Sequence, residues 1–504
     1  MTELVYEDLA VKSEEELAQV RERVRDSAYY NEDLAPAGPA RRTWTTWNIA
    51  AMWIGMSVVI TTYTLASGLM VAGMNWWQAL LTIGLGNLLV LIPMILNAHA
   101  GTRYGIPFPV FVRASFGIRG AQFAAISRAL VACGWFGIQT WLGGLALDAL
   151  LNQLWNGWSD IGIHRAIAFG IFWVIQVWII WGGIEAIKYF ESWTAPILLA
   201  GGAALLVWGF WKAGGVGTTF DKSAELVAGK ADFWTLFWPG LAANVGYWAT
   251  LSLNIPDFTR FARSQRSQAI GQAIGLPLTM IAFSFIGIAV TAATVVIYGE
   301  AIWDPIALLT RIGGAGVLIV AMIVIVLAQI TTNMAANVVA PSNDFSNLSP
   351  RKISFRTGGM ITAVIGILMF PWEIYESAGQ YIFTWLVGYG SLLGAIGAVM
   401  IVDYWFIRRE RLDIVDLYRR SSQYWYVRGV NWRALVAVIV GVAPVIPGFI
   451  DAATTPNFGG FADPTILQRF YTYGFFFTFA VAGVVYFALT WLTEPRRAVA
   501  REAV

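Results

Sequence analysis

The sequence has little charge for its length. Only 13% of its 504 residues are Asp, Glu, Lys or Arg, whereas 57% are hydrophobic. A soluble domain carries about a quarter charged residues, so lipid must cover much of this chain's surface. The net charge of +2 is close to neutral and gives no reason to expect a nucleic-acid partner.

Cysteine and histidine are also scarce. The single cysteine, Cys133, excludes an intramolecular disulfide and a thiol-only metal site. The two histidines, His99 and His164, lie far apart in the sequence, and no carboxylate pair sits deep in an apolar run. The sequence therefore has few of the residues that a metalloenzyme or a Ser-His-Asp hydrolase needs. We expect a protein that is not an enzyme and has no cofactor.

Long apolar runs fill most of the chain. A membrane-spanning helix needs about 20 mostly apolar residues, and twelve segments qualify. These segments are 46–68, 76–97, 123–151, 165–183, 193–211, 233–254, 268–298, 313–338, 357–372, 380–406, 432–450 and 470–492. The pattern predicts an all-α membrane protein with a transmembrane domain over 46–492. Polar tails flank it at 1–45, with a short helix near 14–25, and at 493–504. The first tail lacks the apolar core of a signal peptide.

The distribution of basic residues predicts the orientation. Lys and Arg favour the cytoplasmic side of short loops. With the N-terminus inside, all but six of the 33 Lys and Arg residues fall at or near the inner face. The six on the outer side are Arg165, Lys212, Lys222, Lys230, Arg311 and Arg469. An even number of spans with both termini in the cytoplasm fits this split.

Two of the spans contain residues that interrupt helices. The first carries Gly55 and a Ser/Thr-rich stretch in mid-membrane, and the sixth carries Gly240, Asn244 and Gly246. The two lie five spans apart, and interrupted helices at matching positions indicate inverted repeats around a midplane binding site. The alternative is that these small residues only permit close helix packing.

The polar groups at membrane depth are uncharged. Trp135 and Gln139 are four residues apart, so a helix places them on one face, as an aromatic plate beside an amide. That pair suits a flat ring with N–H and C=O groups. The alternative is that both side chains only join neighbouring helices. Neutral oxygen donors favour sodium, or no coupling ion, over a proton relay.

Several motifs carry a resemblance to a known family. They are NEDLAPAGPARRTW, NAHAGTRYGIPFPVFVRASFGIRGA, WFGIQTWLGGLALD, NIPDFTRFARS, TTNMAANVVAPSNDFSNLSP and VDYWFIRRERLDIVDLY. The chain resembles nucleobase–cation symporter family 1, which includes hydantoin, allantoin, cytosine and uracil permeases. The resemblance implies a LeuT-like fold with two inverted five-helix repeats, about 46–211 and 233–406. Helices 11 and 12, about 432–492, would be added to these repeats.

The resemblance also implies roles for individual residues. Trp135 and Trp248 would stack on the substrate ring, and Gln139 and Asn337 would hydrogen-bond to it. The sodium ligands would be the carbonyls of Gly55, Val58 and Ala328 and the hydroxyls of Thr331 and Thr332. Two positions depart from the hydantoin branch: Val59 replaces a polar residue that faces substrate, and Tyr247 replaces a glycine. Both departures affect the identity of the ring.

The expected function is import of a nucleobase or a related cyclic ureide or amide, of the uracil, allantoin or hydantoin type. The expected mechanism is sodium-coupled symport by alternating access, in the inner (plasma) membrane. A proton-coupled or facilitative carrier of the same rings is the first alternative. A receptor or channel is another, although the sequence shows no repeated filter and no charged ring. The sequence does not indicate an oligomeric state.

Overall fold

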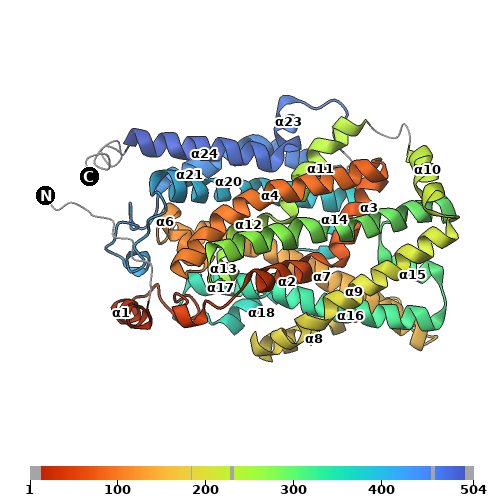
Figure 1. The fold of residues 1–504 in the computed structure, drawn as a ribbon, viewed down its shortest axis with the longest axis horizontal. Coiled ribbons are helices and arrows are strands. Elements are labelled where there is room, and N and C mark those ends of the chain that lie inside the picture. Colours follow the sequence, from red (N-terminus) through yellow and green to blue (C-terminus); the bar gives the residue numbers. More distant parts are fainter. Residues whose placement is uncertain (1–12, 183, 228–231, 456–459, 494–504) are drawn as a thin grey trace.

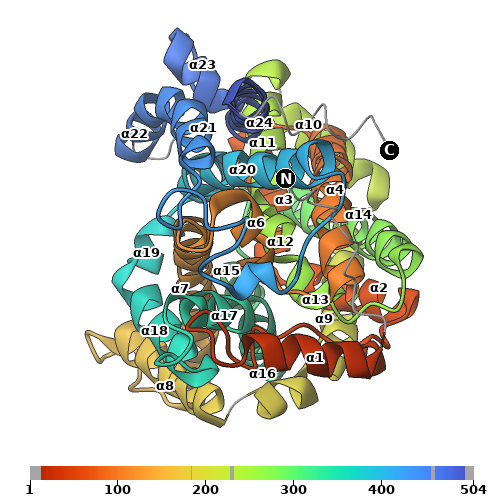
Figure 2. The same ribbon diagram turned by 90° about the vertical axis from the view of Figure 1, so that its left-hand side faces the viewer.

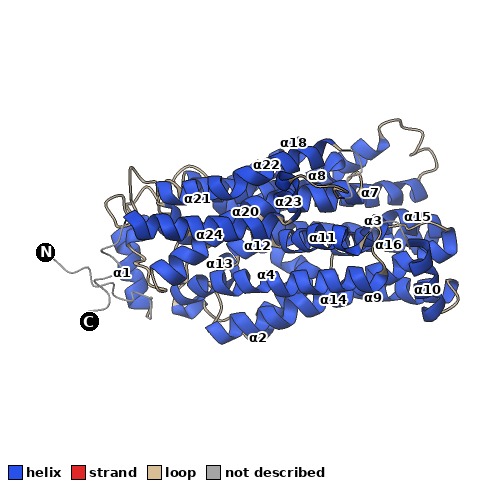
Figure 3. Cartoon of the chain, turned by 90° about the horizontal axis from the view of Figure 1, so that it is seen from above, coloured by secondary structure: helices blue, strands red, loops and turns tan. Residues whose placement is uncertain are grey.

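The computed structural model describes residues 13–182, 184–227, 232–455 and 460–493. Every regular element in these ranges is a helix, and most of the long helices run along the longest axis of the molecule (Figures 1 and 3). Such a bundle satisfies its backbone hydrogen bonds within each helix, which a lipid environment requires. The expectation of an all-helical membrane protein is confirmed.

Helix occupies each of the twelve predicted segments. In chain order these helices are α2 (Thr46–Ser57) with α3 (Ile60–Ala72), α4 (Trp76–Tyr104), α7 (Ala121–Leu154), α8 (His164–Gly182), α9 (Ile184–Lys212), α11 (Phe233–Tyr247) with α12 (Ala249–Asn254), α14 (Gln265–Tyr298), α16 (Ala315–Asn337), α18 (Phe355–Leu368), α20 (Val387–Ile401), α21 (Trp432–Val442) with α22 (Ile446–Thr454), and α24 (Gly474–Thr493). Eight helical stretches in the described ranges are long and apolar enough to cross a bilayer, or ten if two bent pairs each count as one span. The two expected spans outside this count are the interrupted pair α11–α12 and the short helix α18.

Shorter helices connect the long ones. They are α1 (Glu14–Val24), α5 (Phe108–Phe111), α6 (Arg113–Phe116), α10 (Val216–Val227), α13 (Pro256–Thr259), α15 (Pro305–Ile312), α17 (Val339–Leu348), α19 (Pro371–Ile374) and α23 (Ile466–Thr472). Most of them lie toward the ends of the bundle (Figure 1).

The first and sixth spans are interrupted, as predicted. Between α2 and α3 the chain bends by 58°, and Val59 adopts an extended conformation. The amide of Val59 bonds to the carbonyl of Ser57, two residues back, instead of continuing the helical ladder. The sixth span is interrupted at Trp248, whose amide bonds to the carbonyls of Val245 and Gly246. Both interruptions lie in the interior of the bundle, because Val59 and Trp248 are buried.

The segments predicted to face the cytoplasm gather at one end of the bundle. Arg113 donates to the carbonyls of Tyr29 and Leu417, at 3.0 Å each. Arg260 donates to the carbonyl of Asp33 at 3.2 Å. The helix α1 lies at this end, as does the last turn of α24 (Figures 1 and 2). The two ends of the described chain therefore lie on the same side.

The N-terminal segment packs against this end. Leu17 and Val24 of α1 are buried, and so is Leu34 in the following loop. The hydroxyl of Tyr418 donates to the carbonyl of Leu34 at 2.6 Å. The polar composition of residues 1–45 thus conceals a few apolar side chains that attach the segment to the loop after the tenth span.

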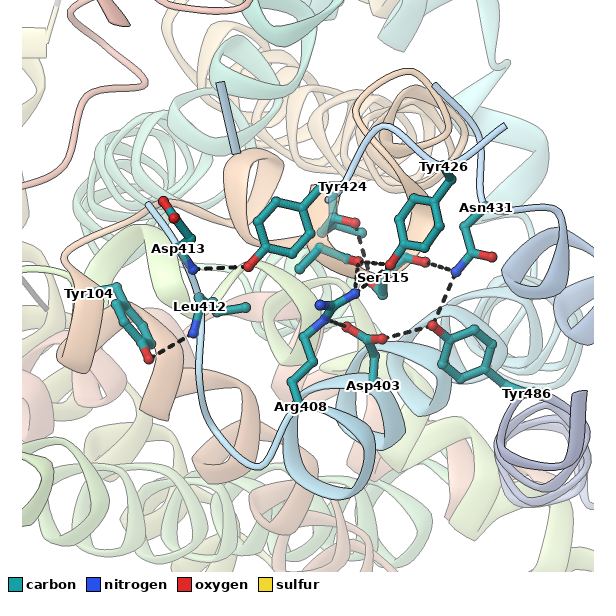
Figure 4. A network of polar contacts seen from close by, with 12 residues as sticks. Tyr104, Ser115, Asp403, Arg408, Leu412, Asp413, Tyr424, Tyr426, Asn431 and Tyr486 are labelled. Carbon is teal, nitrogen blue, oxygen red and sulfur yellow. Dashed lines mark hydrogen bonds and ion pairs between the residues drawn. The ribbon is translucent and has the colours of Figure 1, made fainter. Parts of the chain in front are cut away.

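A polar network at the same end explains the VDYWFIRRERLDIVDLY motif (Figure 4). Arg408 donates to the carboxylate of Asp403 at 2.6 Å and to the carbonyl of Ala114 at 2.9 Å. Tyr486 of α24 donates to the other oxygen of Asp403 at 2.8 Å. Asn431 donates to the carbonyl of Ser115 and to the Tyr486 hydroxyl. The network ties the tenth span to α24 and to the connection between the second and third spans.

The sixth and tenth spans touch through glycines. A Cβ atom added to Gly246 would lie 2.4 Å from the carbonyl oxygen of Leu386, and one added to Gly390 would lie 2.8 Å from the Cα atom of Gly246. Only glycine allows the backbones of α11 and α20 to approach so closely. Close packing is therefore one role of these glycines, as the alternative reading of the sequence held.

Candidate functional site

A small cavity lies where the two interrupted spans meet α7 and α16. Its volume is about 30 Å³, room for one or two water molecules. It is lined by Met56, Val59, Thr61, Trp135, Gln139, Tyr247, Trp248, Thr250, Leu251, Thr332, Ala336 and Asn337. None of these side chains carries a charge, so the cavity suits a neutral molecule. All six residues predicted to bind substrate line this one cavity.

The α7 side of the cavity carries Trp135 and Gln139 on one face, as their spacing predicts. Trp135 is also held by its neighbours: its indole N–H donates to the hydroxyl of Tyr389 at 3.1 Å. Gln139 is 3% exposed, and its Oε1 has no hydrogen-bond partner among the described residues. A buried acceptor without a donor is costly, and a substrate N–H would satisfy it.

The interruption of the sixth span presents Tyr247 and Trp248. The indole N–H of Trp248 donates to the Oδ1 of Asn87 at 2.8 Å, which fixes the ring. The ring of Tyr247 contacts Trp248 at a centroid distance of 4.8 Å and Trp135 at 5.2 Å, edge-to-face in both cases. Its hydroxyl lies 2.8 Å from the hydroxyl of Thr61. Tyr247 thus takes up space beside both indoles and reduces the room left for a ring.

The remaining two predicted residues come from the break in the first span and from α16. Val59 lies at the break and turns its apolar side chain toward the cavity. Asn337 is the last residue of α16, and its amide donates to the Oδ1 of Asn333 one turn earlier, at 3.0 Å. The two asparagines are four residues apart, so they lie on one face of α16.

Sequence reasoning did not single out several residues that shape the cavity. Thr61 and Thr250 line it, Asn87 holds Trp248 and Tyr389 holds Trp135. For Thr61, the Ser/Thr-rich stretch after Gly55 was a usable signal. Asn87 and Tyr389 are 161 and 254 residues away from their partners in the sequence, and no local pattern joins them.

The candidate sodium ligands come from the break in the first span and from α16, two elements that contact each other. The last carbonyls of a helix have no partner within it, so the end of α2 frees oxygens near Gly55 and Val58. The hydroxyl of the fully buried Ser57 also has no partner in the described part of the chain. The Thr331 hydroxyl donates to the carbonyl of Ala328 at 3.0 Å, and Thr332 lines the small cavity. Neutral hard oxygens of this kind fit a sodium ion.

A larger cavity of about 650 Å³ lies elsewhere, between α3, α9, α14, α15 and α16. Its lining is almost entirely aliphatic and aromatic, with residues such as Ile60, Leu205, Phe283 and Val320. It offers few hydrogen-bonding groups to orient a polar ring. The small polar cavity is therefore the better candidate for the site.

A helical membrane bundle with two interrupted spans meeting at a neutral, aromatic cavity defines a membrane transporter rather than an enzyme. A family model described as permease for cytosine/purines, uracil, thiamine and allantoin matches residues 36–472. The chain belongs to this permease family.

Individual relatives agree with this assignment. The chain is 44% identical to a purine-uracil permease of Arabidopsis thaliana, over 92% of this chain and 78% of the relative. It is 40% identical to an allantoin permease of Bacillus subtilis, over 82% of this chain and 85% of the relative. The resemblance to the nucleobase–cation symporters is thereby confirmed.

Solved structures show the same fold. The transporter Mhp1 of the nucleobase-cation-symport-1 family, in a closed conformation with bromovinylhydantoin bound, matches with a TM-score of 0.75 and 27% identity. That match covers 94% of this chain and 96% of Mhp1. A Na⁺-coupled sialic acid symporter shares the fold alone, with a TM-score of 0.60 and 15% identity. The predicted LeuT-like architecture is confirmed.

Proposed function

We propose that this permease imports a small planar ring bearing N–H and C=O groups, a nucleobase or cyclic ureide, by sodium-coupled alternating access. The observation that carries this proposal is the neutral cavity at the junction of the two interrupted spans. Two indoles and two amides line it, from α7, from the break between α11 and α12, and from α16. A flat amide ring is the ligand that can stack on indoles and exchange hydrogen bonds with amides at once.

In this proposal each lining residue has a role. Trp135 and Trp248 stack on the ring, while Gln139 and Asn337 bond to its edge. Val59 supplies an apolar wall, and Tyr247 limits the size of the ring. A ring of eight non-hydrogen atoms needs several times the volume of the one or two waters that fit in about 30 Å³. Binding therefore requires the side chains around the cavity to move apart, with Tyr247 the most direct candidate.

The proposal assigns sodium, as the co-transported ion, to the oxygens of Gly55, Val58, Ala328, Thr331 and Thr332. These oxygens lie on both of the proposed inverted repeats, about 46–211 and 233–406. A positive charge held there would favour the conformation in which the repeats approach each other at this point. Sodium would bind that conformation more tightly than the others. It would therefore raise the affinity for a substrate that binds the same conformation, by linkage.

We place the permease in the inner (plasma) membrane of the cell, with both termini cytoplasmic. The gathering of basic segments at the end that holds α1 supports this orientation, because basic loops favour the cytoplasm. Its partners in this proposal are the lipid bilayer and the ring substrate.

Uptake of radiolabelled uracil, allantoin and hydantoin by proteoliposomes tests the substrate site. Trp135→Ala and Gln139→Ala should each reduce uptake at least tenfold, because each removes a direct contact. The matched control is Trp178→Ala on α8. The side chain of Trp178 is 76% exposed on the outside of the bundle, so this variant should transport normally. Normal uptake by both site variants would contradict the site assignment.

Ion replacement tests the coupling. With sodium replaced by choline, uptake should fall to the level set by passive binding, and an inward sodium gradient should drive accumulation. Thr331→Val should lower the affinity for sodium, because it removes one hydroxyl ligand. Half-maximal uptake should then need a higher sodium concentration. Uptake that follows an imposed proton gradient and ignores sodium would establish the proton-coupled alternative.

A further inference from the structure

Behind Asn337 lies a chain of buried polar side chains that joins α16 to α8 and α7. Asn337 donates to the Oδ1 of Asn333 at 3.0 Å. Asn333 donates in turn to the Oε1 of Gln176 on α8 at 2.6 Å. Gln176 donates to the hydroxyl of Thr140 on α7 at 3.0 Å. Asn333, Gln176 and Thr140 are all fully buried, and none of them lines the cavity.

The direction of this chain is set at its far end. The hydroxyl of Thr140 donates to the backbone carbonyl of Phe136 at 2.6 Å, so that hydroxyl can only accept from the amides. Asn333 also donates to the Phe136 carbonyl, at 3.1 Å. A carbonyl can only accept, so the nitrogen of Asn333 must face α7, and its oxygen must face Asn337. Asn337 must then direct its nitrogen toward Asn333, which leaves its Oδ1 for the cavity.

A second acceptor faces the same cavity. The Oε1 of Gln139 is buried and has no partner in the part of the chain that the structure describes, whereas its nitrogen lies 3.5 Å from the Thr61 hydroxyl. With both amides oriented in this way, the site offers two carbonyl oxygens to a bound ring. A ring with two N–H donors satisfies both, while a ring that lacks one leaves a buried acceptor unpaired.

We propose that Gln176, together with Asn333, is a positioning residue that holds the Asn337 carbonyl toward the cavity. The site consequently selects rings that donate two N–H groups, such as uracil or hydantoin. This inference rests on the proposed function, and it goes further by naming the feature of the ring that is recognised. Gln176 itself touches no substrate and acts only through Asn333 and Asn337.

A role of Gln176 in helix packing can be distinguished from a role in the choice between substrate rings. If Gln176 only stabilised the packing of α8 against α7 and α16, its loss would lower the amount or rate of transport for every ring equally. If it orients Asn337, its loss lets that amide rotate and present N–H instead of C=O. Rings with an acceptor at that edge then gain binding affinity relative to rings with a donor there.

The test measures KM and maximal uptake rate for uracil, with competition by 1-methyluracil, 3-methyluracil and cytosine. Each competitor lacks one of the two ring N–H donors of uracil. The variant is Gln176→Met, which is similar in shape and apolar, and the matched control is Gln272→Met, an equally buried glutamine on α14. Thr140→Val perturbs the same chain with a smaller change and serves if Gln176→Met does not fold.

We expect Gln176→Met to raise KM for uracil about three- to tenfold. Its preference for uracil over at least one methylated ring should fall by a similar factor, with Thr140→Val shifted in the same direction. Gln272→Met should keep the wild-type preference. An unchanged preference in Gln176→Met, with only a lower maximal rate, would overturn the inference. A wild-type chain that binds methylated rings as well as uracil would overturn it while leaving the proposed function intact, and binding of none of these rings would refute both.

Discussion

The ion pair between Arg128 on α7 and Asp344 on α17 supports a quantitative prediction about stability. Their side chains are 1% and 0% exposed, and the charged atoms lie 3.1 Å apart. Replacing Asp344 by Asn keeps the shape of the side chain but leaves the guanidinium buried without its counter-charge. Breaking such a pair from one side costs about 3–5 kcal/mol.

The surroundings of Arg128 place the expected cost at the lower end of this range. Asn254, oriented so that it donates to the carbonyl of Thr250, accepts from the second terminal nitrogen of Arg128 at 3.2 Å. Asp257 also interacts electrostatically with Arg128. A neutral amide and a second carboxylate compensate the buried charge of Arg128 in part. We therefore expect Asp344→Asn to lose about 3 kcal/mol of stability.

Thermal unfolding of the purified protein in detergent, followed by tryptophan fluorescence, measures this effect. Asp344→Asn and Arg128→Met should each lower the melting temperature clearly. The double variant should lose less than the two single losses combined, because it buries no unpaired charge. Glu300→Gln is the control, since it breaks the exposed Arg311–Glu300 pair, and such pairs contribute about 0–1 kcal/mol.

Three results would refute this reasoning. An Asp344→Asn variant that melts with the wild type would mean that Arg128 needs no counter-charge at this position. Strictly additive losses in the double variant would mean that the two side chains stabilise the fold independently. A large loss from Glu300→Gln would show that exposure does not separate the two pairs.

Two further predictions concern the sixth span. Gly246→Ala should destabilise the protein by about 1–3 kcal/mol, because the added Cβ would lie 2.4 Å from the Leu386 carbonyl oxygen. A lowered melting temperature checks this. The control is Gly170→Ala on α8, where an added Cβ meets open space. Tyr247→Ala should admit hydantoins with bulky ring substituents that compete poorly for the wild type, because it removes the ring that contacts both indoles. Competition assays that show the same size limit in both proteins would contradict the role given to Tyr247.

Much of the architecture was predictable because it depends on local sequence. Twelve apolar segments predicted the twelve helical segments, since the length of an apolar run measures its ability to cross a bilayer. Glycine and hydroxyl residues predicted the interruption after Gly55, because they weaken the helical ladder where they occur. Trp135 and Gln139 lie on one helix face because their spacing is close to one helical turn.

Other features depended on which helices pack together. Asn333 and Gln176 are 157 residues apart, and Arg128 and Asp344 are 216 apart. At such separations no helical periodicity predicts that the two residues of a pair come into contact. The N-terminal segment looked like a free polar tail, but its few apolar side chains, Leu17 among them, bury against distant loops.

The amino-acid sequence by itself determined the helical segments, the two interruptions and the neutral character of the polar residues around them. Each of these depends on neighbours within a few turns of one helix. Only the tertiary structure decided that Tyr247 stands beside both indoles and that a buried amide chain lies behind Asn337. These contacts depend on how whole helices cross and approach one another, and that arrangement is the summed result of packing across the entire bundle.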